Sequence, residues 1–452
     1  MRCHTSHCSR RLRSERAGPE ICSDMQDRMR VAISALLIGM VLTGCGGGAS
    51  VTPTLHAPNN QNGSTVRDDW PMYAHDARHT STSLASINGA LKVAWRYDPQ
   101  PIAGDNFGSS FNSIATVGGV YLHWDQFGSG VFSGGPSIDG VSISGQRMWS
   151  YVEHRDFDEG HWASVFHSNV VFEDDGQGFL DANSGAVIKT PAKKWSTSYD
   201  LWGESIPDSS GLYSTNTFLA DGADLFIYSL DATGAARWTQ NQQKSTKYSQ
   251  DQDGALVLSN GLLFYAANYS DPSPFASGIY ALDATSGSQV AYRSTTPWSE
   301  MSADATNVYL VEQGPRLVAR AQSDLHQVWS VNLASTSYAA PVIVNGLVIV
   351  ATGSGIEAHN AGGGSTAWTA PVPTVVSPGL SGMAAASGSN TLLVASSQNL
   401  YLLNLANGTE IWHGKVAGVV GGIENPVIVN DPARGAVVYV TDSRGVIALI
   451  PG

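Results

Sequence analysis

The main body of the chain contains no cysteine. All four cysteines of the 452-residue sequence lie at or before Cys45. Residues 46–452 can therefore form neither a disulfide nor a thiol-dependent catalytic site. The haem attachment motif Cys-x-x-Cys-His is absent as well, which excludes a covalently attached c-type haem. The body must rely on its hydrophobic core for stability.

Charged residues are scarce, and helical periodicity is hard to find. Asp, Glu, Lys and Arg make up 14% of the chain, and the formal net charge is −13 at pH 7. This acidic balance argues against nucleic acid or anionic lipid surfaces as partners. Glycine is abundant, with 48 residues, and turn signals are frequent. The composition therefore indicates an all-β protein.

The apolar run at residues 31–43 is too short to span a bilayer comfortably, since a spanning helix needs roughly 20 residues. It follows the basic Arg28-Met29-Arg30, as the apolar part of a signal peptide does. Leu42-Thr43-Gly44-Cys45 then resembles the bacterial lipobox, in which the signal is cut before a cysteine that is lipidated. We predict lipidation of Cys45. The alternative is an ordinary secretory signal or a short anchor.

The sequence divides into three expected segments. Residues 1–45 are an over-extended start plus a lipoprotein signal peptide, residues 46–67 a flexible tether, and residues 68–452 the folded body. Loss of residues 1–45 removes seven Arg and four acidic residues, which changes the formal net charge from −13 to −16. The residue after the cysteine is Gly46 rather than Asp. By analogy with lipoproteins of enteric bacteria, we expect an anchor in the outer membrane, with the body facing the periplasm.

The body repeats one unit of four predicted strands. Residues 340–353 read as two apolar strands joined by the hairpin turn Asn345-Gly346. A third strand ends in a turn of the type Leu-Asp-Ala-x-x-Gly, and a fourth strand carries Trp. The turn residues Asp181, Asp231 and Asp283 are spaced by 50 and 52 residues. This spacing fits a four-stranded propeller blade, which typically has about 40–50 residues.

The number of blades follows from the number of predicted fourth strands. Seven units end in such a strand, although two of them replace the Trp, at residues 187–188 and 291–292. The eighth unit, at residues 425–450, stops after three strands, while the strand at residues 91–98 stands alone. We therefore predict an eight-bladed β-propeller closed by this N-terminal strand, which removes an exposed edge. A pair of β-sandwiches is the alternative. The predicted structural Trp residues are Trp95, Trp149, Trp238, Trp329, Trp368 and Trp412.

These features resemble the PQQ-type propeller superfamily. The resemblance is carried by Asp69-Trp70-Pro71-Met72-Tyr73, by the strand around Trp95 and by the Leu-Asp-Ala-x-x-Gly…Trp repeats. It covers residues 68–452 and implies a kinship with quinoprotein alcohol dehydrogenases and with non-enzymatic lipoproteins resembling BamB. Quinoprotein dehydrogenases typically stack their cofactor on a disulfide of adjacent cysteines, which this body cannot form. The comparison favours a non-catalytic protein without cofactors. A PQQ- and Ca²⁺-dependent enzyme is the alternative.

Two groups of side chains are candidate binding residues. His154, Asp156, Asp158 and His161 are a weak metal candidate, because nothing fixes their geometry; a solvated acidic loop is the simpler interpretation. Alignment of the first strands on their hairpin turns places Glu204, Glu300 and Glu424 at corresponding positions. First strands line a propeller's channel, so these carboxylates could share one mouth and attract a cation or a basic peptide. Alternatively they are merely hydrated.

The combined prediction is a lipid-anchored, non-catalytic scaffold of the bacterial envelope that binds proteins. By family resemblance alone, outer-membrane protein assembly is a candidate role. A carbohydrate-binding propeller that uses surface aromatic residues is a third possibility beside the quinoprotein enzyme. The partners expected are envelope proteins and, through Cys45, the membrane.

Overall fold

The computed structural model describes the chain from residue 66 onward, with gaps. Cys45 and the predicted signal and tether up to residue 65 lie outside this part. The one helical element in it is the short 3₁₀ turn η1 (Ser387–Ser389), so none of its helices could cross a membrane. The described residues are 66–101, 106–127, 134–152, 163–173, 177–189, 200–202, 205–209, 211–218, 224–241, 256–267, 277–374 and 382–452.

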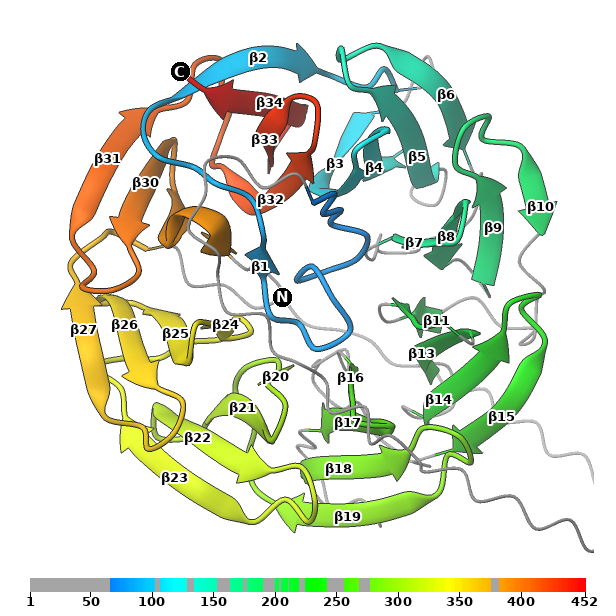
Figure 1. Cartoon of the computed structure of the whole chain (residues 1–452). Helices are drawn as coiled ribbons and strands as arrows, with labels where there is room; N and C mark the ends of the chain where they lie inside the picture. Colours follow the sequence, from blue (N-terminus) through cyan, green and yellow to red (C-terminus); the bar gives the residue numbers. More distant parts are fainter. Residues whose placement is uncertain are drawn as a thin grey trace, which may run out of the picture. The chain divides into compact units, whose positions relative to one another are not determined.

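These residues form an eight-bladed propeller, as predicted (Figure 1). In each blade the first strand lies near the axis and the last at the periphery. β11 and β12 pair with successive parts of β13, and together they provide the inner edge of blade 3. The strands of the first four blades are β3 (Asn106–Thr116), β4 (Gly119–Phe127), β5 (Gly134–Ser142) and β6 (Arg147–Val152); β7 (Ser164–Phe166), β8 (Asn169–Glu173), β9 (Gln177–Asp181) and β10 (Val187–Lys189); β11 (Asp200–Trp202), β12 (Ile206–Pro207), β13 (Gly211–Phe218), β14 (Asp224–Asp231) and β15 (Ala236–Asn241); and β16 (Val257–Ser259), β17 (Leu262–Ala267), β18 (Gly278–Asp283) and β19 (Gln289–Ser294).

The other four blades follow the same plan, with one added strand. The short β1 (Thr82–Ser83) pairs in parallel with the inner strand of blade 7. The strands of blades 5 to 8 are β20 (Ser302–Ala303), β21 (Asn307–Glu312), β22 (Arg316–Ala321) and β23 (Gln327–Asn332); β24 (Val342–Val344), β25 (Leu347–Thr352), β26 (Gly355–Asn360) and β27 (Thr366–Ala370); β28 (Met383–Ala386), β29 (Thr391–Ser396), β30 (Asn399–Asn404) and β31 (Glu410–Lys415); and β32 (Glu424–Asp431), β33 (Gly435–Asp442), β34 (Gly445–Pro451) and β2 (Leu91–Tyr97).

Local sequence explains the hairpins and strands of a blade. In blade 6, Asn345 and Gly346 adopt φ values of 48° and 76°. A two-residue turn with both φ values positive matches the right-handed twist of the flanking strands. The middle strand β25 is buried along nearly its whole length. Continuous apolar runs arise because both faces of a middle strand are covered by neighbouring blades.

The N-terminal strand β2 closes the ring, which confirms the predicted closure. It pairs antiparallel with β34, with Lys92 opposite Ile450 and Tyr97 opposite Val446. Arg96 of β2 also donates two hydrogen bonds of 2.8 Å to the buried carboxylate of Asp442, at the β33–β34 turn. The strand β2 therefore lies in the same sheet as the last three strands of the chain, and blade 8 has the same four-strand plan as the other blades.

Tryptophans on outer strands dock on the next blade. The Trp329 indole N–H of blade 5 donates to the Ala361 carbonyl of blade 6 at 2.7 Å, and the ring lies over Gly364. Trp95 makes the same contact across the closure, to the Ile143 carbonyl of blade 1 at 2.9 Å. Trp149, Trp238 and Trp368 donate equivalently to Ala182, Ala284 and Leu405. Trp412 packs against the core cluster that contains Tyr439 and Leu449 of blade 8.

Candidate functional site at the propeller axis

Residues 68–87, here called the axial strap, run across the inner strands of the propeller before β2 begins. Figure 1 shows this segment in blue within the ring. Its backbone hydrogen-bonds to the inner strands of seven of the eight blades among the described residues. From the start of the strap to its end, the residues that it pairs with on the inner strands are Asn430, Ala115, Val165, Leu258, Ala303, Ile343 and Ala385. The strap is thus a continuous internal brace, with Trp70 and Tyr73 almost fully buried.

The strap lies toward one end of the axis. Each of its inner-strand partners lies in the middle or the C-terminal half of its strand, as Asn430 does in β32 and Ala115 in β3. That is the end at which the first hairpin of each blade turns. The N-terminal ends of the inner strands therefore form the opposite end of the axis. Glu300 and Glu424 lie on that side of the strap, just before β20 and at the start of β32, and Glu300 is close enough to contact the strap itself.

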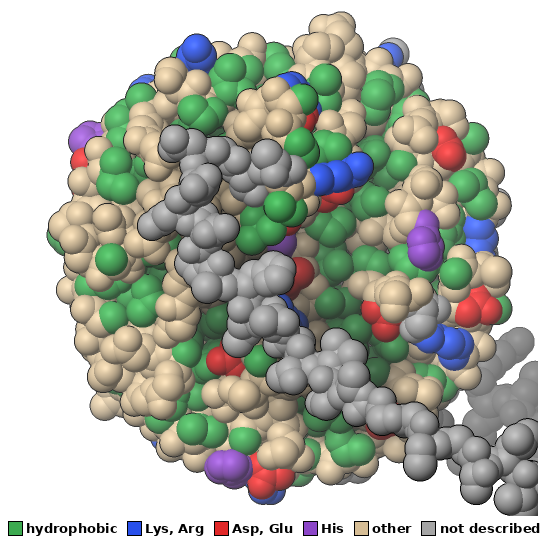
Figure 2. All heavy atoms as spheres, in the orientation of Figure 1, with side chains coloured by type: hydrophobic (Ala, Val, Ile, Leu, Met, Phe, Trp, Pro, Cys, Tyr) green, Lys and Arg blue, Asp and Glu red, His purple; other side chains and the backbone are tan. Residues whose placement is uncertain are grey.

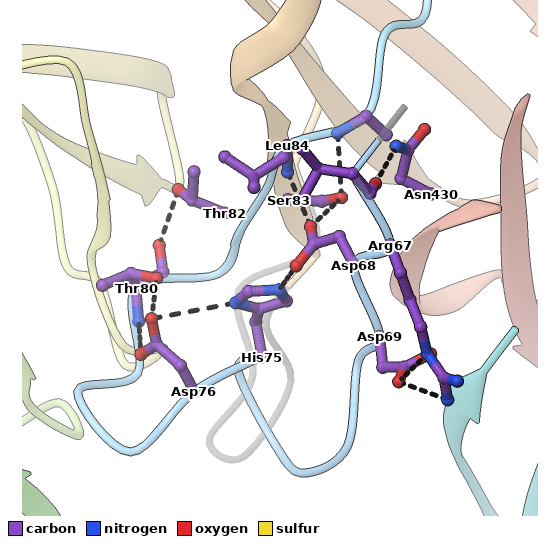
Figure 3. Close-up of polar contacts among 12 residues, drawn as sticks. Arg67, Asp68, Asp69, His75, Asp76, Thr80, Thr82, Ser83, Leu84 and Asn430 are labelled. Atoms are coloured by element: carbon purple, nitrogen blue, oxygen red, sulfur yellow. Dashed lines mark hydrogen bonds and ion pairs between the residues drawn. The ribbon is translucent and has the colours of Figure 1, made fainter. Parts of the chain in front are cut away.

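A histidine whose side chain is 12% exposed holds the strap together (Figure 3). His75 Nε2 lies 3.2 Å from Asp68 Oδ1, and His75 Nδ1 lies 3.7 Å from Asp76 Oδ2. The other oxygen of Asp68 accepts hydrogen bonds from Ser83 Oγ at 2.7 Å and from the Leu84 backbone N–H at 2.6 Å. The start, middle and end of the strap are therefore joined through one carboxylate–imidazole–carboxylate group.

The two carboxylates keep His75 charged. Burial alone would lower the pKa of His75, but its hydrogen bonds and charge interactions with Asp68 and Asp76 raise it to about 9. Burial opposes ionisation of Asp76 as well, yet contact with His75 and hydrogen bonds from Thr80 lower its pKa to about 2. The group is therefore ionised across the ordinary pH range and serves a structural role.

Tyr73 connects opposite sides of the ring. Its side chain shares a hydrophobic cluster with Ile114 of blade 1 and Ala163 beside blade 2. Its hydroxyl donates to Glu300 Oε2, and Glu300 precedes the inner strand of blade 5. Since blade 5 lies across the ring from blades 1 and 2, this contact crosses the axis. The Tyr73 phenol and the Glu300 carboxylate therefore lie at the level where the axis is closed.

His79 supports Tyr73 from the side as a neutral ring. The two rings meet edge to face, with centroids 5.3 Å apart and an interplanar angle of 88°. Complete burial lowers the pKa of His79 to about 4, against the opposing effects of Asp76 and of a hydrogen bond with the Met301 backbone. Tyr73, His79 and Glu300 form a polar group that could bind a ligand or move a proton at the axis.

Glu424 occupies a different environment from Glu300. It lies at a β-bulge of β32, and burial raises the pKa of its carboxyl. No carboxylate contributes to that shift. Among the described residues no hydrogen bond or ion pair joins Glu300 to Glu424. Glu204 lies outside the described residues. Of the three carboxylates predicted to share one mouth of the channel, the structure therefore places two, Glu300 and Glu424, which lie on the same side of the strap.

The described residues do not fit a calcium–quinone site. Nowhere in the described ranges do three His, Cys, Asp or Glu side chains come close enough together to hold a metal ion. The sequence also lacks the adjacent cysteines of the quinoprotein enzymes after Cys45. The weak candidate His154, Asp156, Asp158 and His161 lies outside the described residues. We therefore derive no step through such a cofactor.

The position of the strap within the ring was not predicted from the sequence. The segment from Asp69 to Tyr73 carries the family resemblance, but that resemblance gives it no place in the ring. One signal was available. Trp70, Met72 and Tyr73 follow each other closely without strand alternation, as in a segment that packs its apolar residues on several different elements.

Figure 2 shows that the drawn face is hollowed near its centre, where acidic and histidine side chains lie among hydrophobic ones.

The chain is similar to proteins of two different kinds at the sequence level. Residues 275–450 match the family described as outer membrane protein assembly factor BamB. Over 428 residues the chain is 27% identical to tetrathionate hydrolase of Acidithiobacillus ferrooxidans, an alignment that covers 89% of this chain and 74% of that protein.

Solved structures of low identity share the fold. Quinohemoprotein alcohol dehydrogenase from Comamonas testosteroni superposes with a TM-score of 0.59 at 14% identity, over 84% of this chain and 80% of that one. BamB from Moraxella catarrhalis superposes with a TM-score of 0.53 at 14% identity, over 80% of this chain and 98% of that one. Likeness at such identities concerns the fold alone.

Proposed function

We propose that this propeller of the PQQ-like superfamily is a lipid-anchored, non-catalytic scaffold of the bacterial cell envelope that binds protein partners. The match of residues 275–450 to the BamB family supports a role in the envelope, with outer-membrane protein assembly as the specific candidate. The observation that carries the proposal is the distribution of apolar side chains on the surface.

Exposed apolar side chains gather on the outer strands. Eleven large hydrophobic residues are exposed in the described part of the chain, and seven of them lie on outer strands of six blades. We call these seven residues the rim. The rim consists of Val93, Met148, Val187, Ile188, Val290, Val328 and Ile411. Single exposed apolar residues are ordinary, but repetition at one structural level around a ring is the pattern of an interaction surface.

The outer strands also offer backbone hydrogen bonds. Each is the last strand of its sheet, so it presents unpaired N–H and C=O groups to the outside. An extended segment of a partner can pair with such an edge while its apolar side chains meet the rim. We therefore expect partners that contribute extended, apolar segments. The braced ring favours this use because its binding surface is already organised before the partner arrives.

The anchor would confine this surface to a membrane. Lipidation of Cys45 followed by the tether of residues 46–67 would hold the propeller close to the bilayer, which raises its effective concentration toward membrane-bound partners. By the sequence argument the membrane is the outer one and the propeller faces the periplasm. Replacement of Cys45 by Ser should release the protein from the membrane fraction, and retention there would contradict the anchor.

In-cell crosslinking followed by affinity purification tests the scaffold. The wild-type chain should be recovered with a reproducible set of envelope proteins. A Val328→Glu/Ile411→Glu variant should lose most of that set, because two charges would be buried at the interface. Gln327→Glu, which adds a charge beside Val328 on an exposed side chain of β23, is the matched control and should retain the set. Equal recovery from both variants would reject the rim as the binding surface.

A hydrolase is the second candidate function. It is favoured by the long alignment with tetrathionate hydrolase together with the Tyr73–Glu300 contact at the axis. In that case Glu300 would exchange a proton with the substrate or a water molecule while Tyr73 orients it. Consumption of tetrathionate by the purified chain, abolished in Glu300→Gln, would displace the scaffold proposal. Cofactor-dependent alcohol oxidation after addition of PQQ and Ca²⁺ would instead revive the quinoprotein alternative.

A further inference from the structure

A group of buried oxygen atoms lies where blade 8 meets blade 1. We call Asn112, Ser113, Glu424, Asn425 and Thr441 the seam niche. Glu424 and Thr441 lie directly opposite each other in the β32–β33 ladder, so their side chains share one face of blade 8. Asn425 Nδ2 donates to Asn112 Oδ1 of blade 1 at 3.4 Å. The niche therefore spans the two blades that close the ring.

The orientation of the facing sheets brings these groups toward each other. Thr441 lies two residues after Tyr439 in β33, so the two side chains share one face, and the Tyr439 ring contacts Trp95 at a centroid distance of 5.8 Å. Trp95 docks on Ile143 of blade 1, so this face of blade 8 looks at blade 1. In blade 1, Ser113 lies between Phe111 and Ala115 on the face whose residues share a core cluster with Tyr439. Ser113 and Thr441 therefore belong to the two surfaces that meet at the seam.

Three oxygen atoms of the niche lack hydrogen-bond partners among the described residues. They are Asn425 Oδ1, Ser113 Oγ and Thr441 Oγ1, and their residues are 3%, 1% and 0% exposed. Buried polar atoms in native proteins are nearly always satisfied, so unpartnered oxygen atoms on the two facing blades of the seam point to a bound species. The half-buried Glu424 carboxylate adds one negative charge at the same place.

The backbone at Asn425 is strained in a way that supports a function. Asn425, the second residue of β32, has φ of 45°, and it precedes Pro426. A residue before proline is normally restricted to extended conformations. The β-bulge between Glu424 and Val427 accommodates this conformation and turns the Asn425 amide away from regular strand alternation. Backbone strain of this kind is often found at functional sites, where it holds a side chain in the position that the site requires.

We propose that the seam niche binds a hard metal cation such as Ca²⁺ or Na⁺. Its acceptors are all oxygen atoms, namely a carboxylate, amide carbonyls and hydroxyls, which are the ligands that hard cations prefer. A single carboxylate gives a site of low charge and hence of modest affinity. Because ligands come from both blades, the cation strengthens the closure of the ring. This site is distinct from the rim and from Glu300, and it is independent of the proposed function.

Thermal unfolding of the full chain after removal of metals by chelation tests the proposal. In choline chloride of matched ionic strength, CaCl₂ or NaCl at about a hundredfold above its dissociation constant should raise the unfolding midpoint by roughly 3 °C. The salt that produces the shift identifies the cation, and choline controls for ionic strength. Absence of a shift with both salts would overturn the proposal and leave ordered water as the partner of these oxygens.

Substitutions localise the shift to the niche. Glu424→Gln and Thr441→Val should each remove the cation-dependent shift, whereas Glu300→Gln, at the same end of the axis but outside the niche, should keep it. Calorimetric titration of CaCl₂ and of NaCl into the metal-free chain provides a second measurement that does not depend on unfolding. Binding in the wild-type chain that persists unchanged in Glu424→Gln would contradict the assignment.

Discussion

At the scale of single residues, the recurring contact between a tryptophan and a turn glycine joins one blade to the next. In blade 6 the turn residue Gly364 has φ of 72°, and a Cβ atom placed there would lie 2.6 Å from Cε3 of Trp329 in blade 5. Two constraints therefore act on this glycine. Its backbone conformation is unfavourable for other residues, and its missing side chain makes room for the indole ring.

Gly364→Ala should destabilise the protein by at least about 1–2 kcal/mol, the cost of a left-handed residue with a Cβ atom, before displacement of Trp329 is counted. Chemical denaturation measures the change. Gly362→Ala is the matched control, since nothing lies within 4 Å of a Cβ atom at that position of the same turn. It should be close to neutral. Equal losses in the two variants would show that the Trp329 contact is not the cause.

At the scale of elements, the axial strap converts eight separate sheets into a braced ring. Its geometry depends on the ion group of Asp68, His75 and Asp76 described above. In a pH titration the folded-state pKa of His75, about 9, lies above its ordinary value of 6.5. The stabilising contribution of His75 is therefore fully present below about pH 6.5 and is lost as the pH rises through about 9.

The pKa of Asp76 is shifted in the opposite direction to that of His75, so its contribution to stability is lost at low pH. The folded-state pKa of Asp76, about 2, lies below its ordinary value of 3.8, so its contribution is present above about pH 3.8 and is lost as the pH falls through about 2. The ion group should therefore stabilise the strap most between about pH 4 and pH 6.5.

The free energy of unfolding of the wild type minus that of His75→Gln should fall by roughly 3 kcal/mol between pH 6 and pH 10, an amount that follows from the size of the pKa change. Urea denaturation at several pH values measures this difference. His326→Gln, which removes an exposed imidazole outside the strap, is the control. A pH-independent difference for His75→Gln would mean that the imidazole acts by packing alone.

At the scale of the whole molecule, the ring is closed by β2, which precedes the first blade in sequence, and the last three strands of the chain. The strap and β2 precede the first complete blade in sequence, yet they contact blades on every side. Deletion of residues 1–98 should therefore abolish cooperative unfolding of the entire propeller, because it removes the axial brace and the outer strand of blade 8. The midpoint and cooperativity of thermal unfolding report this loss.

Deletion of residues 1–67 is the control for that experiment. It retains the strap from Asp68 onward together with β2, so the cooperative transition should persist with a similar midpoint. A cooperative, native-like transition after deletion of residues 1–98 would show that seven complete blades suffice, and it would contradict the structural importance of the closure.

The propeller, its eight blades and the closing strand at Trp95 could all be predicted from the repeats in the sequence. Those features depend on short-range patterns, such as alternation within strands, turn residues and Trp at a regular interval, so a single sequence displays them. The comparisons with known proteins confirm the resemblance to PQQ-like propellers that these patterns indicated.

Only the tertiary structure decided the interior of the ring. Tyr73 and Glu300 are 227 residues apart, and Asn112 and Asn425 are 313 apart, yet each pair forms a hydrogen bond. No local pattern relates such positions. They meet because closing the ring brings the first and last blades together, and because the strap crosses the axis to reach blades that are distant in sequence. The folded body therefore owes its blades to local sequence, and its axial site and seam niche to ring closure.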